Sequence, residues 1–211
     1  MNVKRVFDVF FAILGITLLL PVFVILAVLI VADSKGGVFY RQTRVGRNNI
    51  NFTLFKFRTM RANAEKLGLL TVGERDPRVT FIGYYLRKYK MDELPQLLNV
   101  LCGDMSFVGP RPEVRKYVEL YNSGQQQVLS VKPGITDWAS IYFRNENQLL
   151  KNSDDPEAFY IQNIIPSKIN QNLEYIRHNN IWIDLKIIAL TLQKVIINDG
   201  RGAKFDQRRS N

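Results

Sequence analysis

The chain has 211 residues and a mass of 24.4 kDa, which is room for one ordinary domain and an appendage. Its formal net charge of +10 favours an anionic partner, such as a nucleic acid, an anionic membrane surface or a phosphate-bearing substrate. One cysteine, Cys102, and one histidine, His178, exclude a disulfide framework and a cysteine-rich zinc site, leave little for imidazole chemistry, and make carboxylates the expected catalytic groups.

Residues 9–32 form an uncharged, strongly apolar stretch that follows Lys4 and Arg5. As one helix it would measure about 36 Å, against about 30 Å for a bilayer core. A cleaved signal peptide is disfavoured, because the run is long and no small-residue cleavage site closes it. Pro21 lies near the middle and predicts a kink. Two interpretations stay open: a kinked spanning helix, or a helix–break–helix hairpin with both ends on one side, which the basic flanks favour in part.

Residues 34–64 carry basic side chains without an acidic one. The two β-rich segments FYRQTRVG and NFTLFKFRTM flank a Gly-Arg-Asn-Asn turn and predict a β-hairpin. We expect its cations to face phosphates or lipid headgroups rather than to form only a solvated strand face. The basic residues are Lys35, Arg41, Arg44, Arg47, Lys56, Arg58 and Arg61.

The rest of the chain predicts a mixture of short helices and strands, and therefore an α+β fold. Gly103 is a suitable helix stop, and we expect Cys102 just before it to be buried. The last helix is apolar enough to dock on the core or to lie at a membrane interface. The predicted helices cover residues 81–90, 92–101, 113–121, 157–178 and 181–197, and the predicted strands lie in MSFVGPRPEV and VKPGITDWASI. The predicted division is a membrane segment at 1–34, a catalytic domain at 35–198 and a loose basic tail at 199–211.

The segment KMDELPQLLNVLCGD places Asp92 and Glu93 at the start of a predicted helix. One interpretation is structural: Asp92 caps the helix, and Glu93 is stabilised by the positive end of its dipole. The other is catalytic, because a helix N-terminus would keep Asp92 ionised and oriented as a nucleophile. Spacing alone leaves both open.

Downstream, GPRPEV places Arg111 between two prolines. The prolines fix the backbone, so the guanidinium is presented rigidly, and a guanidinium pairs with phosphate oxygens through two hydrogen bonds. An incidental arginine in a surface turn is the alternative. Together with the carboxylates, Arg111 points to phosphate chemistry.

These motifs resemble those of a known family. FKFRTM, then DPRVTFIGYYLRKYKMDELPQLLNVLCGDMSFVGPRPE, then KPGITDWASI follow a basic-flanked apolar segment with a central proline. In that order they are similar to the bacterial sugar transferases, and more closely to the small monotopic polyprenyl-phosphate phosphoglycosyl transferases. The resemblance runs from about residue 2 to about residue 197.

The resemblance implies an activity and a place for it. Members transfer a sugar-1-phosphate from a UDP-sugar to a polyprenyl phosphate, release UMP and so begin bacterial glycan assembly. By resemblance the apolar segment is a re-entrant helix broken at Pro21, and the catalytic domain lies on the cytoplasmic face of the bacterial inner membrane, on anionic lipids. The resemblance includes no nucleic acid as partner. It leaves open the sugar, the glycan pathway and the oligomeric state, for which a homodimer is one alternative.

The resemblance also implies roles for individual residues. Asp92 would attack the phosphorus next to the sugar and form a phosphosugar-enzyme intermediate, which polyprenyl phosphate then resolves. Glu93 would act as base or help Asp92 hold the Mg²⁺ that the family requires. Arg111, Lys56 and Arg58 would bind substrate phosphates.

The sequence departs from the family pattern at three points. Leu20 stands before Pro21 and Met91 before Asp92, where many members have a serine or another small hydroxyl residue. The additional N-terminal membrane domain of larger members is also missing from this sequence, so we expect a minimal catalytic form. Two other function classes remain to be weighed: a membrane-anchored scaffold, for which Asp92 would be dispensable, and a nucleic-acid-binding protein argued from charge alone.

Overall fold

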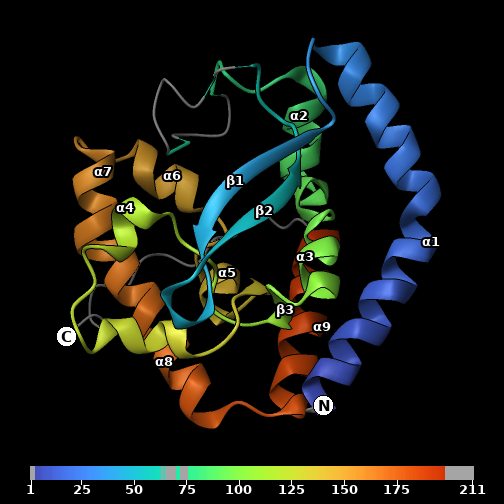
Figure 1. Cartoon of the computed structure of the whole chain (residues 1–211). Helices are drawn as coiled ribbons and strands as arrows, with labels where there is room; N and C mark the ends of the chain where they lie inside the picture. The colour runs from blue at the N-terminus through green and yellow to red at the C-terminus, as the bar shows by residue number, and fades with distance from the viewer. Residues whose placement is uncertain (1–2, 63, 65–69, 72–75, 198–211) are drawn as a thin grey trace.

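We describe residues 3–62, 64, 70–71 and 76–197 from a computed structural model of the chain. The described residues form an α+β fold, as predicted, with one antiparallel and one parallel pair of strands (Figure 1). The helices are α1 (Val3–Asp33), α2 (Phe81–Lys88), α3 (Gln96–Cys102), α4 (Arg115–Val118), α5 (Trp138–Tyr142), α6 (Glu146–Lys151), α7 (Pro156–Phe159), α8 (Ile165–His178) and α9 (Ile181–Ile197). The strands are β1 (Phe39–Val45), β2 (Asn51–Phe57), β3 (Ser106–Val108) and β4 (Gly134–Thr136).

Helix α1 continues through Pro21 as one helix, and it is bowed along the side of the molecule in Figure 1. Its inner side packs against α3 and α2, with Ala12 in one apolar cluster and Leu26 and Ile30 in another. Its outer side is exposed: Leu18 exposes 68% of its surface and Val28 64%. Among the described residues, α1 is the helix long and apolar enough to cross a membrane. The two membrane interpretations are taken up with the proposed function.

The predicted β-hairpin is present as β1 and β2, paired from Phe39 opposite Phe57 to Val45 opposite Asn51. A short 3₁₀ turn, η1 (Arg47–Asn49), joins them, and Asn48 within it takes a left-handed backbone conformation with φ 56°. Asparagine tolerates this conformation better than most residues do, which suits it to the turn.

The carboxylate pair precedes the helix that was expected to begin with it. Met91–Glu93 form a 3₁₀ turn, η3, and α3 begins only at Gln96, after Pro95. Lys90 enters the turn in a left-handed conformation with φ 56°. The chain therefore turns at Lys90, and Leu94 and Pro95 continue a helical backbone from η3 into α3.

The second half of the chain also differs in detail from the expected elements. The parallel pair β3–β4 joins MSFV to GIT, but Trp138–Tyr142 form helix α5, not the end of a strand. The reason is a helix cap: Asp137 accepts a hydrogen bond from the backbone N–H of Ser140 at 2.6 Å. The helix expected over 157–178 is interrupted by a π-helical segment, η5 (Tyr160–Ile164), whereas α9 spans its predicted residues 181–197.

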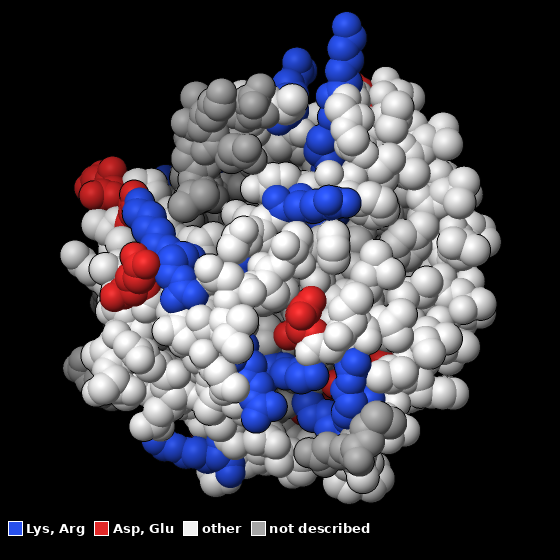
Figure 2. Space-filling model, in the orientation of Figure 1, with Lys and Arg blue, Asp and Glu red and all other residues white. Residues whose placement is uncertain are grey.

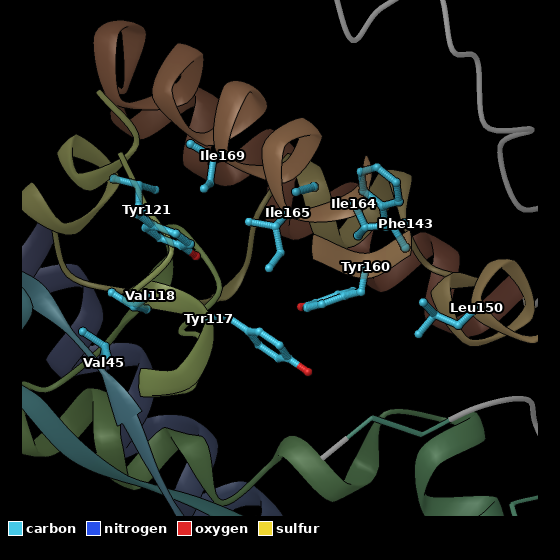
Figure 3. Packing of buried hydrophobic residues seen from close by; sticks show 12 residues of the cluster. Val45, Tyr117, Val118, Tyr121, Phe143, Leu150, Tyr160, Ile164, Ile165 and Ile169 are labelled. Atoms are coloured by element: carbon cyan, nitrogen blue, oxygen red, sulfur yellow. The ribbon is translucent and has the colours of Figure 1, made fainter. Parts of the chain in front are cut away.

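The largest apolar core lies between α8 and the α4–β1 region (Figure 3). Tyr117 and Tyr160 meet there with ring centroids 5.1 Å apart, and Ile164 and Ile169 fill the space along η5 and α8. A pocket lined by core residues such as Val118 and Ile165 lies beside the loop that carries Arg111. Cys102 lies outside it and is exposed, contrary to expectation, because it occupies the outer side of the last turn of α3. The basic tail predicted at 199–211 lies outside the described residues.

Candidate active site

Three charged side chains from separate elements meet beside β2. Arg111 donates a hydrogen bond to Glu93 Oε2 at 3.1 Å and pairs with Glu93 Oε1, so the guanidinium binds the carboxylate through both oxygens. Lys56 Nζ of β2 lies 3.3 Å from Glu93 Oε1. Glu93 is buried, with 8% of its surface exposed. The structure thus brings together Glu93, Arg111 and Lys56, three of the residues singled out in the sequence.

Asp92 lies next to this cluster but is bonded differently. It is 7% exposed, and its Oδ1 is buried without a hydrogen-bond partner among the described residues. Neither η3 nor α3 has a side-chain cap in the described structure, so Asp92 does not cap a helix. A buried carboxylate oxygen without a partner is costly to stability and is typical of a site that meets a ligand. The interpretation of Asp92 as a helix cap is therefore contradicted by the structure.

The two adjacent carboxyls have opposite electrostatic environments. Burial, and then the charge of Glu93, raise the pKa of Asp92. Burial would raise the pKa of Glu93 as well, but the charges of Arg111 and Lys56 hold it well below its usual value. The helix-dipole argument, which predicted an easily ionised Asp92, is thus opposed by burial. Glu93 is a fixed anion, whereas the cations that act on Asp92, such as Lys56 and Arg87, do not outweigh its burial.

The cations are tuned by the same cluster. Burial lowers the pKa of Lys56, although the charge of Glu93 opposes this. The charge of Glu93 raises the pKa of Arg111 and keeps the guanidinium protonated. Two carboxylates and two cations therefore face one another in a buried place, and a phosphate entering it would meet cations that are already in position.

Asn99 holds two of these elements together, and the sequence reasoning missed it. Its side-chain amide accepts a hydrogen bond from Phe55 N at 3.0 Å and donates to Thr53 O at 2.7 Å, so α3 is bound to the edge of β2. Asn99 is fully buried. A polar residue on the apolar side of a predicted helix was the signal that could have found it. The contact fixes β2, and hence Lys56, relative to the turn that carries Glu93.

Arg87 of α2 is a second residue that sequence reasoning missed. It donates to Thr59 Oγ1 at 2.9 Å and to Thr71 Oγ1 at 3.1 Å. Burial lowers its pKa, and the charge of Asp92 acts in the opposite direction. Arg87 therefore supplies a further buried cation whose charge acts on Asp92.

Arg58 is not brought into the cluster. Its guanidinium donates to Ile30 O at 3.2 Å, to Ser34 O at 2.6 Å and to Lys35 O. These carbonyls belong to the last turn of α1 and the residues after it; Ile30 O also accepts from the backbone N–H of Ser34, and Ser34 O and Lys35 O lie beyond the end of the helix. The structure thus gives the Arg58 guanidinium a role at the end of α1, where it satisfies three backbone acceptors.

Other cations of the hairpin are likewise engaged by the protein. Arg44 donates to Pro112 O at 3.0 Å, and Arg47 donates to Ser130 O at 3.1 Å. The expectation that the hairpin's cations face phosphates or headgroups as a group is corrected for these two, because unpaired carbonyls of neighbouring loops need donors. Arg61 is exposed.

The donor set fits a hard cation with few protein ligands. Asp92 and Glu93 supply carboxylate oxygens, which Mg²⁺ prefers, and Asp92 Oδ1 is buried without a partner among the described residues. Within those residues no group of three or more His, Cys, Asp or Glu side chains could form a metal site. Mg²⁺ usually keeps several waters and binds one or two carboxylates together with substrate phosphates, and this pair meets that requirement.

Comparison of the sequence with known proteins shows the family to which the chain belongs. A family model described as bacterial sugar transferase matches residues 1–198. The chain is 35% identical over 201 residues to a UDP-N-acetylgalactosamine-undecaprenyl-phosphate N-acetylgalactosaminephosphotransferase of Aeromonas hydrophila, which covers 94% of the chain and 44% of the relative. It is 37% identical over 199 residues to a UDP-glucose:undecaprenyl-phosphate glucose-1-phosphate transferase of Escherichia coli, covering 92% and 40%.

A third relative is matched over nearly its whole length. The uncharacterized sugar transferase EpsL of Bacillus subtilis is 39% identical over 202 residues, which is 95% of the chain and 90% of the relative. The chain spans less than half the length of the first two relatives. Residues 1–198, which the family model matches, include the carboxylate pair and the arginine between prolines.

Proposed function

Because the chain belongs to the bacterial sugar transferase family, we propose that it transfers a sugar-1-phosphate from a UDP-sugar to a polyprenyl phosphate and releases UMP. The names of two relatives give undecaprenyl phosphate as the acceptor and UDP-sugars as donors. The observation that carries the proposal is the asymmetry of the carboxylate pair. Glu93 is held by Arg111 and Lys56, while the buried Asp92 Oδ1 has no partner among the described residues.

In the first step, an oxygen of Asp92 attacks the phosphorus that bears the sugar. A bond forms between that oxygen and phosphorus, the bond to the bridging oxygen of the diphosphate breaks, and UMP leaves with the electron pair. Arg111 and Lys56 bind the non-bridging oxygens as charge develops on them. They are prepared for this role because Glu93 already holds them in place.

In the second step, a phosphate oxygen of the polyprenyl phosphate attacks the same phosphorus. The aspartyl–phosphorus bond breaks, Asp92 regains its electron pair, and a polyprenyl diphosphate sugar leaves. The acceptor enters as a phosphate anion, so no strong base is needed for it. Glu93 serves here as the fixed anion that orients the two cations.

A bound Mg²⁺ would neutralise the phosphate oxygens and stabilise the leaving diphosphate oxygen. Asp92 and Glu93 are the residues that would hold it. The reason is a matter of charge: two carboxylates face two cations, so the protein alone offers little net positive charge to a doubly charged diphosphate, even with Arg87 nearby.

We place the activity at a membrane surface, with α1 as a re-entrant segment whose ends lie on one side. Both ends of α1 are bound by the same body: Arg5 donates to Leu101 O at 2.9 Å, and Asp33 accepts from Ile82 N at 2.8 Å. The outer side of α1, at the right edge of Figure 2, is uncharged in that view. A spanning helix would carry its two ends to opposite sides of the bilayer, beyond the reach of one domain in water. By resemblance that side is the cytoplasmic face.

The test is UMP release from a panel of UDP-sugars by the purified full chain, with Mg²⁺ and undecaprenyl phosphate. We expect release with at least one donor, multiple turnovers only with the lipid phosphate, and a loss of about 10³-fold or more in Asp92→Asn. Release that survives in Asp92→Asn would overturn the role of Asp92 as nucleophile. No release with any donor would favour the second candidate, a membrane-anchored scaffold of the same fold.

A further inference from the structure

The loop that carries Arg111 continues a parallel strand pair. Val108 of β3 lies beside Thr136 of β4, and Gly109 N donates to Thr136 O at 3.1 Å. The pairing is unusually close here, because a Cβ at Gly134 would lie 2.1 Å from Gly109 N, and a Cβ at Gly109 would lie 2.5 Å from the carbonyl oxygen of Lys132. The backbone that leads to Arg111 is thus fixed by its neighbour up to Pro110.

Beyond Pro110, the side chain of Asp137 accepts the backbone hydrogen bond that a continued β4 would otherwise accept. The chain after β4 turns away into α5, so the backbone N–H of Arg111 has no carbonyl of β4 to bind. It donates instead to Asp137 Oδ2 at 3.2 Å. The other oxygen, Oδ1, accepts from Ser140 N at 2.6 Å. One carboxylate thereby joins the Arg111 loop to the first turn of α5.

Burial makes this contact rigid. Asp137 exposes 0% of its surface, and both of its oxygens accept backbone hydrogen bonds. Its charge also contributes to the raised pKa of Arg111, after the larger effect of Glu93. Arg111 is therefore held at two points: its backbone by Asp137 and its guanidinium by Glu93.

We propose that Asp137 is a positioning residue that holds the Arg111 guanidinium toward the Asp92–Glu93 pair. The proposal rests on the proposed function, because the phosphate that Arg111 would bind belongs to that reaction. A helix cap alone would stabilise α5 and leave the arginine unaffected. A positioning role also requires that the loss of kcat/KM on substituting Asp137 depend on the presence of Arg111.

The variants are Asp137→Ala and Asp137→Asn, with Asp155→Ala as a matched control. Asp155 also caps a short helix, α7, by accepting from Glu157 N at 3.1 Å and Ala158 N at 3.0 Å, but it is exposed. We expect kcat/KM for the UDP-sugar to fall about 10- to 100-fold in Asp137→Ala, since small displacements of a catalytic group cost that much. Asp137→Asn, which keeps one acceptor oxygen, should retain more activity, and Asp155→Ala should match the wild type.

A double variant separates positioning from general stability. If Asp137 acts through Arg111, adding Asp137→Ala to Arg111→Ala should cause no further loss of kcat/KM. Equal losses in the presence and absence of Arg111 would overturn the proposal. So would an Asp137→Ala variant whose activity equals that of Asp155→Ala.

Amide hydrogen exchange gives a readout that does not depend on activity. In the full chain in lipid nanodiscs, exchange over residues 108–113 should become faster in Asp137→Ala and stay unchanged in Asp155→Ala. Unchanged exchange over 108–113 in Asp137→Ala would overturn the proposal even if activity fell. A wild-type chain that releases no UMP would instead overturn the proposed function, while the exchange comparison would still decide whether Asp137 fixes this loop.

Discussion

Asp92 and Glu93 are neighbours in the chain, yet their contributions to stability should have opposite signs. Asp92 is buried with a raised pKa, whereas Glu93 is held ionised by Arg111 and Lys56. In metal-free buffer at neutral pH, Asp92→Asn should raise the free energy of unfolding by about 1 kcal/mol, and Glu93→Gln should lower it by about 3 kcal/mol. The melting temperature of each variant in EDTA measures this.

The effect of Asp92→Asn should also depend on pH. A carboxyl whose pKa is raised by folding destabilises the folded state at neutral pH, because the unfolded chain carries the ionised carboxylate without the cost of burial. Below its ordinary pKa of 3.8 the carboxyl is protonated in both states, and the difference between variant and wild type should vanish. A melting temperature that falls in Asp92→Asn at neutral pH would contradict the unpartnered environment described for this oxygen.

Lys56 and Arg58 lie two residues apart on one strand segment but should lose different properties when substituted. Lys56→Ala removes a cation from the carboxylate cluster, so kcat/KM should fall about 100-fold with little change in melting temperature. Arg58→Ala removes a donor from three carbonyls at the end of α1, of which Ile30 O keeps the N–H of Ser34, and this should cost about 1–3 kcal/mol of stability. Kinetics and thermal unfolding of the two variants distinguish the roles; equal kinetic losses would return Arg58 to the substrate site.

Sequence alone grouped Asp92, Glu93, Lys56 and Arg111 into one predicted site by resemblance, and the structure brings Glu93, Lys56 and Arg111 into contact beside Asp92. It could not assign Arg58, because its partners are backbone carbonyls more than 20 residues away, which leave no side-chain pattern to read. Sequence likewise could not predict the hydrogen bond from the backbone N–H of Arg111 to the Asp137 carboxylate. Contacts of this kind are fixed by tertiary structure and not by residue type.

At the level of elements, the hairpin and α9 followed from periodicity, whereas the turn around Asp92 did not. Runs of β-branched and aromatic residues on either side of a turn favour a hairpin, and the signal is local. By contrast, η3 exists because Lys90 adopts a left-handed conformation and because α3 starts after Pro95. A left-handed lysine is unfavourable on its own and is held there by its surroundings, so local propensity could not predict it.

Asn99 should couple the hairpin to α3 in both stability and activity. Its amide binds the backbone of Thr53 and Phe55 as a neighbouring strand would. Asn99→Ala leaves a buried N–H and a buried C=O unpaired, so the free energy of unfolding should fall by about 2–4 kcal/mol. Because the strand also carries Lys56, the variant that still folds should show a lower kcat/KM. Asn99→Asp is the matched substitution: it keeps the acceptor for Phe55 N and loses the donor to Thr53 O.

If Asn99→Asp kept full stability, the donated bond to Thr53 O would be of no energetic value. If Asn99→Ala kept full activity, β2 would be positioned by its pairing with β1 alone. Hydrogen exchange over residues 51–57 reports on both, because the Phe55 amide loses its partner only in Asn99→Ala.

For the whole molecule, the decisive question is how α1 meets the membrane. Its two ends are fixed on one body by charged groups: Lys4 donates to Val108 O at 3.0 Å at one end, and Arg58 binds the carbonyls at the other. Between them the outer side is apolar and exposed. One body in water cannot hold both ends of a helix that spans the bilayer, whereas a bowed helix inserted from one side can bury its exposed side chains in lipid and keep both ends wet.

Single-cysteine variants test this geometry in a Cys102→Ser background, which removes the exposed native thiol. Val3→Cys and Gly37→Cys mark the two ends of α1, and Asp154→Cys marks the rest of the domain. All three positions are exposed. In inverted membrane vesicles, a membrane-impermeant maleimide should label all three to the same extent and leave Leu18→Cys protected. Labelling of Val3→Cys only after the vesicles are made permeable would mean that α1 spans the bilayer. The contacts of Lys4 and Arg5 could then not form at the same time as those of Arg58, because the two sets would lie on opposite sides of the membrane.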